Sequence, residues 1–143
     1  MASLYELFKT SNKLEKEGVT IDYGEAGKFV IARMGGENSA YAKYLRAKLK
    51  QYKFQIDTDS LPADTERQIL LDVFVKTVLL GWDGVTDENG REIRFSEENA
   101  KKLLSDLPVL FDDLRSKAQD YTNFRQEELK VEAKNSENTS AGS

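Results

Sequence analysis

Apolar side chains recur every three or four residues along most of this chain, which is the spacing of amphipathic helices. The first such segment follows a Ser-x-x-Glu capping box at residues 3–6 and runs to Gly18, a residue suited to end a helix. Four further segments follow helix-start signals, namely Asn38 or Ser39, Pro62, Ser96 and Pro108. The pattern therefore predicts about five helices.

A different pattern, the alternation of apolar and polar residues, occupies residues 19–23, and an extended apolar run follows at residues 29–32. Gly24 and Gly27 lie between the two runs, where a tight turn would join neighbouring strands. The predicted fold class is therefore mainly α (α+β), a helical domain of about five helices with a small N-terminal β-hairpin.

Residues 69–82 are apolar on nearly every side of a helix, apart from Asp72 and Lys76. A helix without a polar face is expected at the centre of a fold. The segment is also too short to span a bilayer. It is therefore predicted to be the central buried helix and the core of the domain.

The length of 143 residues suits one domain with a core of its own. We assign residues 1–134 to a single globular domain. Residues 135–143 are too polar to join a core, and they are predicted to form a disordered C-terminal tail.

The chain contains no His and no Cys, and its net charge is −4. The absence of His removes the commonest general acid–base group and the commonest metal ligand. Residues 1–14 also lack the apolar core of a signal peptide, and a Cys-free chain fits a reducing compartment. We therefore expect a cytoplasmic protein that is not an enzyme and that needs neither a cofactor nor a metal.

The loop at residues 83–95 approaches the pattern of a calcium-binding loop. With Gly90 at the sixth position, Asp87 and Asn89 take the third and fifth positions. Val85 and Ser96 then stand where the first carboxylate and the bidentate carboxylate are required. The loop is better explained as a surface turn at Asn89-Gly90, and we predict that it binds no calcium.

A basic stretch interleaves cations with aromatic residues between positions 41 and 54. Its cations are Lys43, Arg46, Lys48, Lys50 and Lys53, and its aromatic residues are Tyr41, Tyr44, Tyr52 and Phe54. This combination is also found in nucleic-acid-binding surfaces. Because the tyrosines fall on the apolar stripe and the net charge is negative, a solvated face or a contact with an acidic partner is favoured over nucleic acid.

Three segments together resemble the tail assembly chaperones of long-tailed bacteriophages: Gly-Trp-Asp-Gly-Val at 81–85, Asp-Glu-Asn-Gly at 87–90 and Phe-Ser-Glu-Glu-Asn-Ala at 95–100. Similar segments occur at residues 30–33, before Asn38 and Tyr41, and at residues 107–111, 124–125 and 133–135. The likeness extends over about residues 19–135. It departs at Val109, where an acidic residue is expected.

The resemblance implies a non-catalytic protein that binds the tape-measure protein and assists assembly of the tail tube. The resemblance also implies that the protein acts in the host bacterial cytoplasm and is absent from the mature virion. Self-association is expected as well, and no membrane is implied. The alternative is a nucleic-acid-binding or regulatory phage protein that uses the basic helix face at residues 43–53.

Holding a helical client requires exposed apolar surface. The candidate contacts are Leu4, Leu7 and Phe8 on the N-terminal helix, together with Trp82. Both sets are also explained as core residues, and for Trp82 this explanation is favoured. For the basic face, the candidates are Lys43, Arg46 and Lys50.

Ala133-Lys134-Asn135 is compatible with a −1 slip site in the coding sequence, because Lys-Asn can be read from an A-rich heptamer. From the residues alone, this is an ordinary dipeptide near a polar terminus. The resemblance adds a reason to test it, since these chaperones commonly have a short form and a frameshift-extended form. The longer form would contact the major tail-tube protein.

Overall fold

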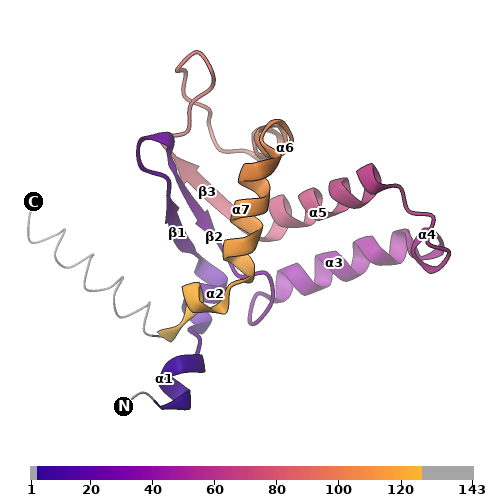
Figure 1. Cartoon of the computed structure of the whole chain (residues 1–143), viewed down its shortest axis with the longest axis horizontal. Helices are drawn as coiled ribbons and strands as arrows, with labels where there is room; N and C mark the ends of the chain where they lie inside the picture. The colour runs from indigo at the N-terminus through magenta and orange to yellow at the C-terminus, as the bar shows by residue number, and fades with distance from the viewer. Residues whose placement is uncertain (1–2, 127–143) are drawn as a thin grey trace, which may run out of the picture.

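The computed structural model describes residues 3–126, which contain seven α-helices and one three-stranded sheet (Figure 1). The helices are α1 (Leu4–Phe8), α2 (Asn12–Glu17), α3 (Ser39–Gln51), α4 (Lys53–Asp57), α5 (Ala63–Thr77), α6 (Glu97–Asp106) and α7 (Pro108–Gln119). The strands are β1 (Val19–Asp22), β2 (Lys28–Ile31) and β3 (Leu79–Asp83), and two short 3₁₀ helices are η1 (Gly24–Ala26) and η2 (Tyr121–Phe124). The predicted fold class, mainly α with a small β component, is confirmed.

The predicted hairpin is formed by β1 and β2, which pair antiparallel with Val19 opposite Ile31. The turn between them contains η1, and Gly24 and Gly27 both have positive φ there. Such angles suit glycine because it has no Cβ. The strand β3 then pairs antiparallel with β2 and completes a sheet of order β1-β2-β3.

The prediction of one helix over residues 69–82 is wrong at its C-terminal end. Helix α5 ends at Thr77, and residues 79–83 form β3. A short apolar run fits a buried strand as well as a buried helix. The strand forms here because β2 offers a free edge, and the Ala32 N–H also donates to the Val78 carbonyl at 2.8 Å.

The first predicted helix is likewise divided into α1 and α2. The break at residues 9–11 pairs with the segment after η2, where the Ser11 N–H donates to the Phe124 carbonyl and Thr10 bridges to Arg125. The Ser11 hydroxyl then caps α2 by accepting from the Leu14 N–H at 3.2 Å. This long-range pairing replaces the helical bonds that a continuous helix would make.

The core lies between one face of the sheet and helices α5, α6 and α7. Phe74 and Phe111 meet edge to face there, with ring centroids 5.4 Å apart. Helix α7 buries Phe111, Leu114 and Ala118, which lie three and four positions apart and so share one face of the helix. Most of the apolar residues at positions 69–82 are buried too, as predicted, namely Ile69, Leu71, Val73, Phe74, Val75, Val78 and Leu79.

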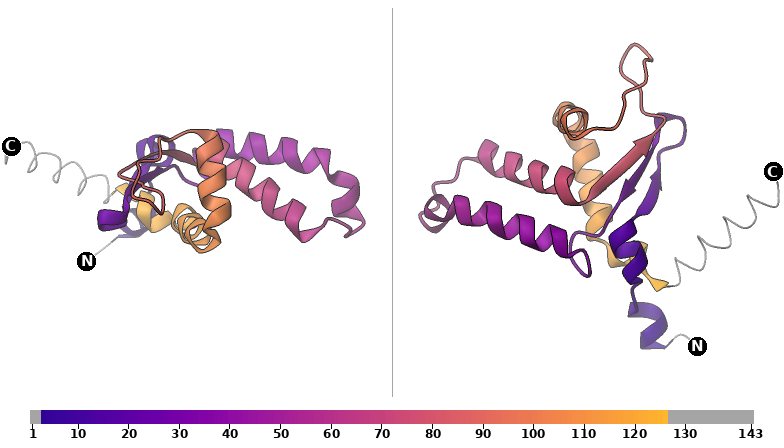
Figure 2. Two further views of the ribbon diagram at one scale, coloured as in Figure 1. Left: turned by 90° about the horizontal axis from the view of Figure 1, so that it is seen from above. Right: turned by 180° about the vertical axis from the view of Figure 1, so that it is seen from behind.

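Helices α3, α4 and α5 form an arm that projects away from the sheet, with α4 at its tip (Figure 2). The two long helices of the arm, α3 and α5, lie side by side in both views. Helix α5 has six buried residues, all from position 69 onward, whereas α3 and α4 have none. The arm is therefore packed at its base and largely solvent-exposed toward its tip.

Among residues 3–126, no helix is long and apolar enough to cross a membrane. The predicted tail at residues 135–143 and the end of the predicted domain at residue 134 lie outside the described residues.

Candidate functional site

The base of the arm is fixed by a network of polar side chains. The Asn38 side-chain amide donates to the Arg33 carbonyl at 2.9 Å and to the Thr77 carbonyl at 3.0 Å. It thereby connects the start of α3 to the end of α5. Asn38 occupies the N-cap position that the sequence predicts, but its side chain forms these bonds in place of a capping bond.

Glu15 completes this network from helix α2. Its carboxylate accepts from Arg33 Nη1 at 2.7 Å and from the Glu37 backbone N–H at 2.6 Å. Burial alone would raise the pKa of Glu15, but hydrogen bonds from Thr10, Glu37 and Arg33 together hold it below the ordinary value. The Glu15 carboxylate therefore connects helix α2 to the segment that leads into α3.

The five cations of α3 and α4 divide into two groups. Lys48 pairs with Asp72 at 3.6 Å, and Lys53 pairs with Asp57 at 2.5 Å. The other three, which are Lys43, Arg46 and Lys50, form no ion pair with any residue in 3–126, and all three are exposed. They lie three and four positions apart on α3, so they share one face of the helix.

Beside these cations, apolar side chains are exposed at the corner between α3 and α4. A groove of about 390 Å³ is lined by Leu49 and Ile56, with Arg46, Lys50, Lys53 and Asp57 around them. Leu49 is 42% exposed and the neighbouring Phe54 is 75% exposed. The corner therefore combines an apolar floor with a basic rim, which suits the binding of another protein segment.

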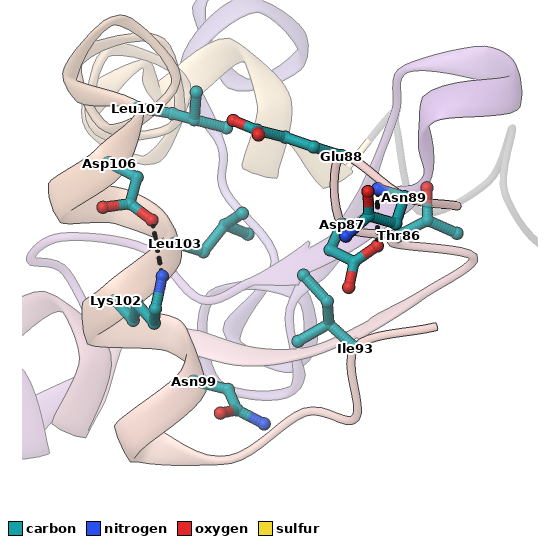
Figure 3. A pocket seen from close by; sticks show the side chains of 10 residues that line it. All are labelled: Thr86, Asp87, Glu88, Asn89, Ile93, Asn99, Lys102, Leu103, Asp106 and Leu107. Carbon is teal, nitrogen blue, oxygen red and sulfur yellow. Dashed lines mark hydrogen bonds and ion pairs between the residues drawn. The ribbon is translucent and has the colours of Figure 1, made fainter. Parts of the chain in front are cut away.

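A second concave surface lies between the loop after β3 and helix α6 (Figure 3). It has a volume of about 340 Å³, and Ile93 and Leu103 point into it from opposite sides. Asp87, Glu88 and Asp106 supply an acidic rim. Its other lining residues are Thr86, Asn89, Asn99, Lys102 and Leu107.

Two of the three carboxylates around this cleft, those of Asp87 and Asp106, form hydrogen bonds or an ion pair with nearby residues. Asp87 accepts from the N–H groups of Asn89 and Arg91, both at 2.9 Å, and Lys102 pairs with Asp106 at 2.9 Å. The Lys102 pKa is raised because its ammonium group donates to Asp106. The lining residues include no Ser, Cys or His that such a carboxylate would activate.

The loop that approaches the calcium-binding pattern folds as a tight turn with Glu88 and Asn89 at its centre and Gly90 at its end. Gly90 has a φ of 79°, and the Gly90 N–H donates to the Asp87 carbonyl at 3.0 Å. Within residues 3–126, no group of three or more His, Cys, Asp or Glu side chains is placed to hold a metal ion. Calorimetry with calcium at micromolar concentration, the range of calcium sensors, is expected to show no binding. A melting temperature raised by calcium and not by sodium would contradict this prediction.

Trp82 lies half-buried at the edge of the core. Its ring meets Phe29 and Phe95 edge to face, with centroids 5.8 Å and 5.1 Å away. The indole N–H donates to the Ile93 carbonyl at 2.8 Å. Trp82 thus holds the loop after β3 against the sheet, as expected of a core residue.

The N-terminal candidates are placed at the surface by helix α1. Leu4 is 72% exposed and Phe8 is 58% exposed, while Leu7 is more covered. Phe8 stacks on Tyr121 of η2 at 5.8 Å between ring centroids. Figure 1 shows α1 near the N-terminus, away from the α4 tip of the arm, so the structure does not join the two candidate surfaces into one site.

The family model of the YdaY prophage protein matches residues 36–135, which is more than half of the chain. The chain belongs to the YdaY prophage protein family. It is therefore a phage-derived protein. The match begins just before α3 and includes the arm, β3, the cleft and α7. No curated protein and no solved structure gives a significant match to this chain.

The sequence did not identify the cleft residues Ile93, Leu103 and Leu107 as a surface. It also did not indicate that Leu49 of α3 is partly exposed. The signal that was available is the Phe54-x-Ile56 pair directly after Lys53, the last cation of the basic stretch. Apolar residues that follow a cationic helix face without any intervening acid indicate an amphiphilic surface.

Proposed function

We propose that this phage protein is a tail assembly chaperone that binds the tape-measure protein and assists tail-tube assembly without catalysing a reaction. One observation carries the proposal furthest, namely the exposed apolar side chains on the short helices α1 and α4 of a phage-derived protein. A protein that keeps a long helical client soluble needs such surfaces. The resemblance in residues 81–100 to tail assembly chaperones supports the same role.

The proposed role places the protein in the host bacterial cytoplasm and outside the mature virion. It also includes self-association, because exposed apolar side chains can bind a second copy as well as a client. The client would lie as a helix against an apolar surface, the helix-in-groove mode of recognition.

The direct test is co-expression with the tape-measure protein encoded by the same prophage. The proposal expects more soluble tape-measure protein and its recovery with the chaperone in a pull-down. A Leu7→Glu and Phe8→Glu double variant tests the N-terminal surface, and Lys13→Glu is a control at an exposed position on α2. A tape-measure protein that stays insoluble and is not recovered would contradict the function.

The alternative, a nucleic-acid-binding or regulatory protein, is favoured by the three exposed cations on α3 that form no ion pair with any residue between positions 3 and 126. Phosphate contacts would make such binding steeply salt-dependent. The expected result for a chaperone is no retention of duplex or single-stranded oligonucleotide at physiological salt.

A frameshift-extended form is part of the same proposal, and its site at Ala133-Lys134-Asn135 lies outside the described residues. A ribosome slipping there would keep the folded domain and replace the residues after Asn135. The added segment would recruit the major tail-tube protein. Codons that break the A-rich heptamer, or a closed −1 frame, would remove this site.

A further inference from the structure

The corner between α3 and α4 leaves apolar side chains partly exposed within the described residues. Neither helix contains a buried residue. Leu49 and Ile56 line the groove while remaining 42% and 40% exposed. Packing within residues 3–126 thus leaves apolar area in contact with water, a cost that a bound partner would remove.

The charge of this corner limits what the partner is. Residues 39–56 contain five cations and no acidic residue, although the whole chain carries a net charge of −4. Three of those cations, Lys43, Arg46 and Lys50, form no ion pair within the described residues. A partner that fits must therefore bring negative charge together with apolar side chains.

The spacing of the cations further favours a helical partner. Arg46 and Lys50 are four residues apart on α3, so they lie one helical turn apart beside the groove. Carboxylates one turn apart on a facing helix would meet both cations. The apolar residues between those carboxylates would then rest on Leu49 and Ile56.

We propose that the groove at the α3–α4 corner binds an amphipathic helix whose polar face is acidic. This inference rests on the proposed function in taking that helix to be a segment of the client. It adds the place of binding and the chemistry of the segment that is bound.

Nucleic acid fits this corner less well. The groove has an apolar floor of Leu49 and Ile56, which offers a phosphate backbone no hydrogen-bond donor. Tyr44 and Tyr52 are half-buried, and Lys48 lies over the Tyr44 ring at 5.6 Å. These tyrosines therefore offer no exposed ring on which a base could stack, and Phe54, which is 75% exposed, is the aromatic side chain of the corner that could do so.

The test uses the full chain and two synthetic helical peptides of roughly 20 residues, about 30 Å long. The peptides share one apolar stripe, and their polar face is Glu in one and Lys in the other. Fluorescence anisotropy is expected to show binding of the acidic peptide, weakened by salt. Equal binding of both peptides, or binding of the basic one alone, would overturn the proposal.

Charge reversal locates the site. The Arg46→Glu and Lys50→Glu double variant is expected to weaken binding of the acidic peptide at least about tenfold, which corresponds to about 1.4 kcal/mol. The matched control reverses Lys13 and Arg91, which are exposed cations on α2 and in the loop after β3. An equal loss in this control would show attraction by net charge alone and would overturn the site.

A second pair of variants tests the apolar floor. Leu49→Ser is expected to weaken the acidic peptide severalfold, whereas Val109→Ser, at an exposed position on α7, leaves it unchanged. Single-stranded oligonucleotide is titrated in parallel. If it binds through Arg46 and Lys50 more tightly than the peptide, and without dependence on Leu49, the corner is a nucleic-acid site and the proposal is wrong.

The experiments distinguish a failure of the docking site from a failure of the proposed function. If the acidic peptide binds at the corner but tape-measure protein is not recovered, the docking site is supported and the proposed function is contradicted. If tape-measure protein is recovered equally well with the Arg46→Glu and Lys50→Glu double variant, the proposed function is supported and the docking site is contradicted.

Discussion

Glu15 shows how one buried carboxylate connects two parts of this molecule. It is 1% exposed, and it receives hydrogen bonds from Arg33 and from the backbone of Glu37. Gly36 lies so close that a Cβ at that position would be 2.6 Å from Glu15 Oε2. Glu15 therefore fits in this position because residue 36 is a glycine, which has no side chain.

Replacing this carboxylate is expected to weaken the fold. Glu15→Gln leaves the Arg33 guanidinium with a neutral partner, and we expect a loss of about 2 kcal/mol in the free energy of unfolding at about pH 7. Urea denaturation of the wild type and the variant measures this difference in the free energy of unfolding. Glu17→Gln, at an exposed position on the same helix, is the control and should change the stability little.

The same contribution should depend on pH in one direction. Because the pKa of Glu15 in the folded protein lies below its ordinary 4.5, the ionised form is favoured by folding. The stabilisation is complete above about pH 4.5 and is lost as the pH falls through the lower, folded-state pKa. The difference between the wild type and Glu15→Gln should therefore shrink at about pH 3. A difference that stays constant between the two pH values would contradict this account.

Phe74 tests the core at the scale of one side chain. It is buried on α5 and meets Phe111 of α7 edge to face. Phe74→Ala should destabilise the protein by about 3–5 kcal/mol, because it removes the ring contacts and leaves a cavity. Gln68→Ala, on the exposed side of the same helix, is the control. A loss below about 1 kcal/mol for Phe74→Ala would show that α5 is not the central helix.

At the scale of elements, the junction between α2 and β1 depends on Gly18. Its φ is 95°, and a Cβ there would lie 2.8 Å from Val30 Cγ1 and 3.0 Å from the Ile31 carbonyl oxygen. Gly18→Ala should therefore cost more than backbone strain alone, about 2–3 kcal/mol. Gly24→Ala is a matched control, because Gly24 also has positive φ but has no atom within 4 Å of the added Cβ.

Thermal or urea unfolding of the two glycine variants separates strain from crowding. Gly24→Ala should show the strain of the left-handed conformation alone, about 1 kcal/mol. Equal losses at Gly18 and Gly24 would mean that the sheet yields around the added methyl group, and that the packing of Val30 against α2 is loose.

Local sequence signals predicted the elements whose ends are set locally. Ser96 caps α6 by accepting from the Asn99 N–H at 3.0 Å, and Pro108 occupies the first turn of α7. The sequence could not place the end of α5, because the apolar run from Val78 continues into β3 without a polar break. Pairing with β2, about fifty positions away in the chain, decides that boundary.

The candidate site was less accessible to sequence reasoning than the fold. Periodicity shows which residues share a helix face, but not whether another element covers that face. Leu49 and Phe54 are exposed because α3 and α4 stand clear of the sheet and of α7 (Figure 2). Their exposure is a property of the arm as a whole.

At the scale of the whole molecule, the uneven burial predicts uneven stability. Helices α3 and α4 contribute no buried residue, whereas α7 contributes Phe111, Leu114 and Ala118. Segments with few buried apolar contacts open locally at a lower free energy than the core. Amide hydrogen exchange should therefore be faster over residues 44–57 than over α5 from residue 69 onward and over α7.

The base of the arm should differ from its tip in the same experiment. Asn38 and Lys48 connect α3 to the end and the middle of α5, so exchange should quicken from the base toward α4. The acidic peptide should slow exchange at the α3–α4 corner more than at α1. Uniform protection along α3, equal to that of α7, would mean that the arm opens only with the whole domain. Under the proposed function, an arm of that kind could not adapt to clients of different sequence by loosening at its tip, and the proposed specificity would then come from the fixed positions of Arg46, Leu49 and Lys50.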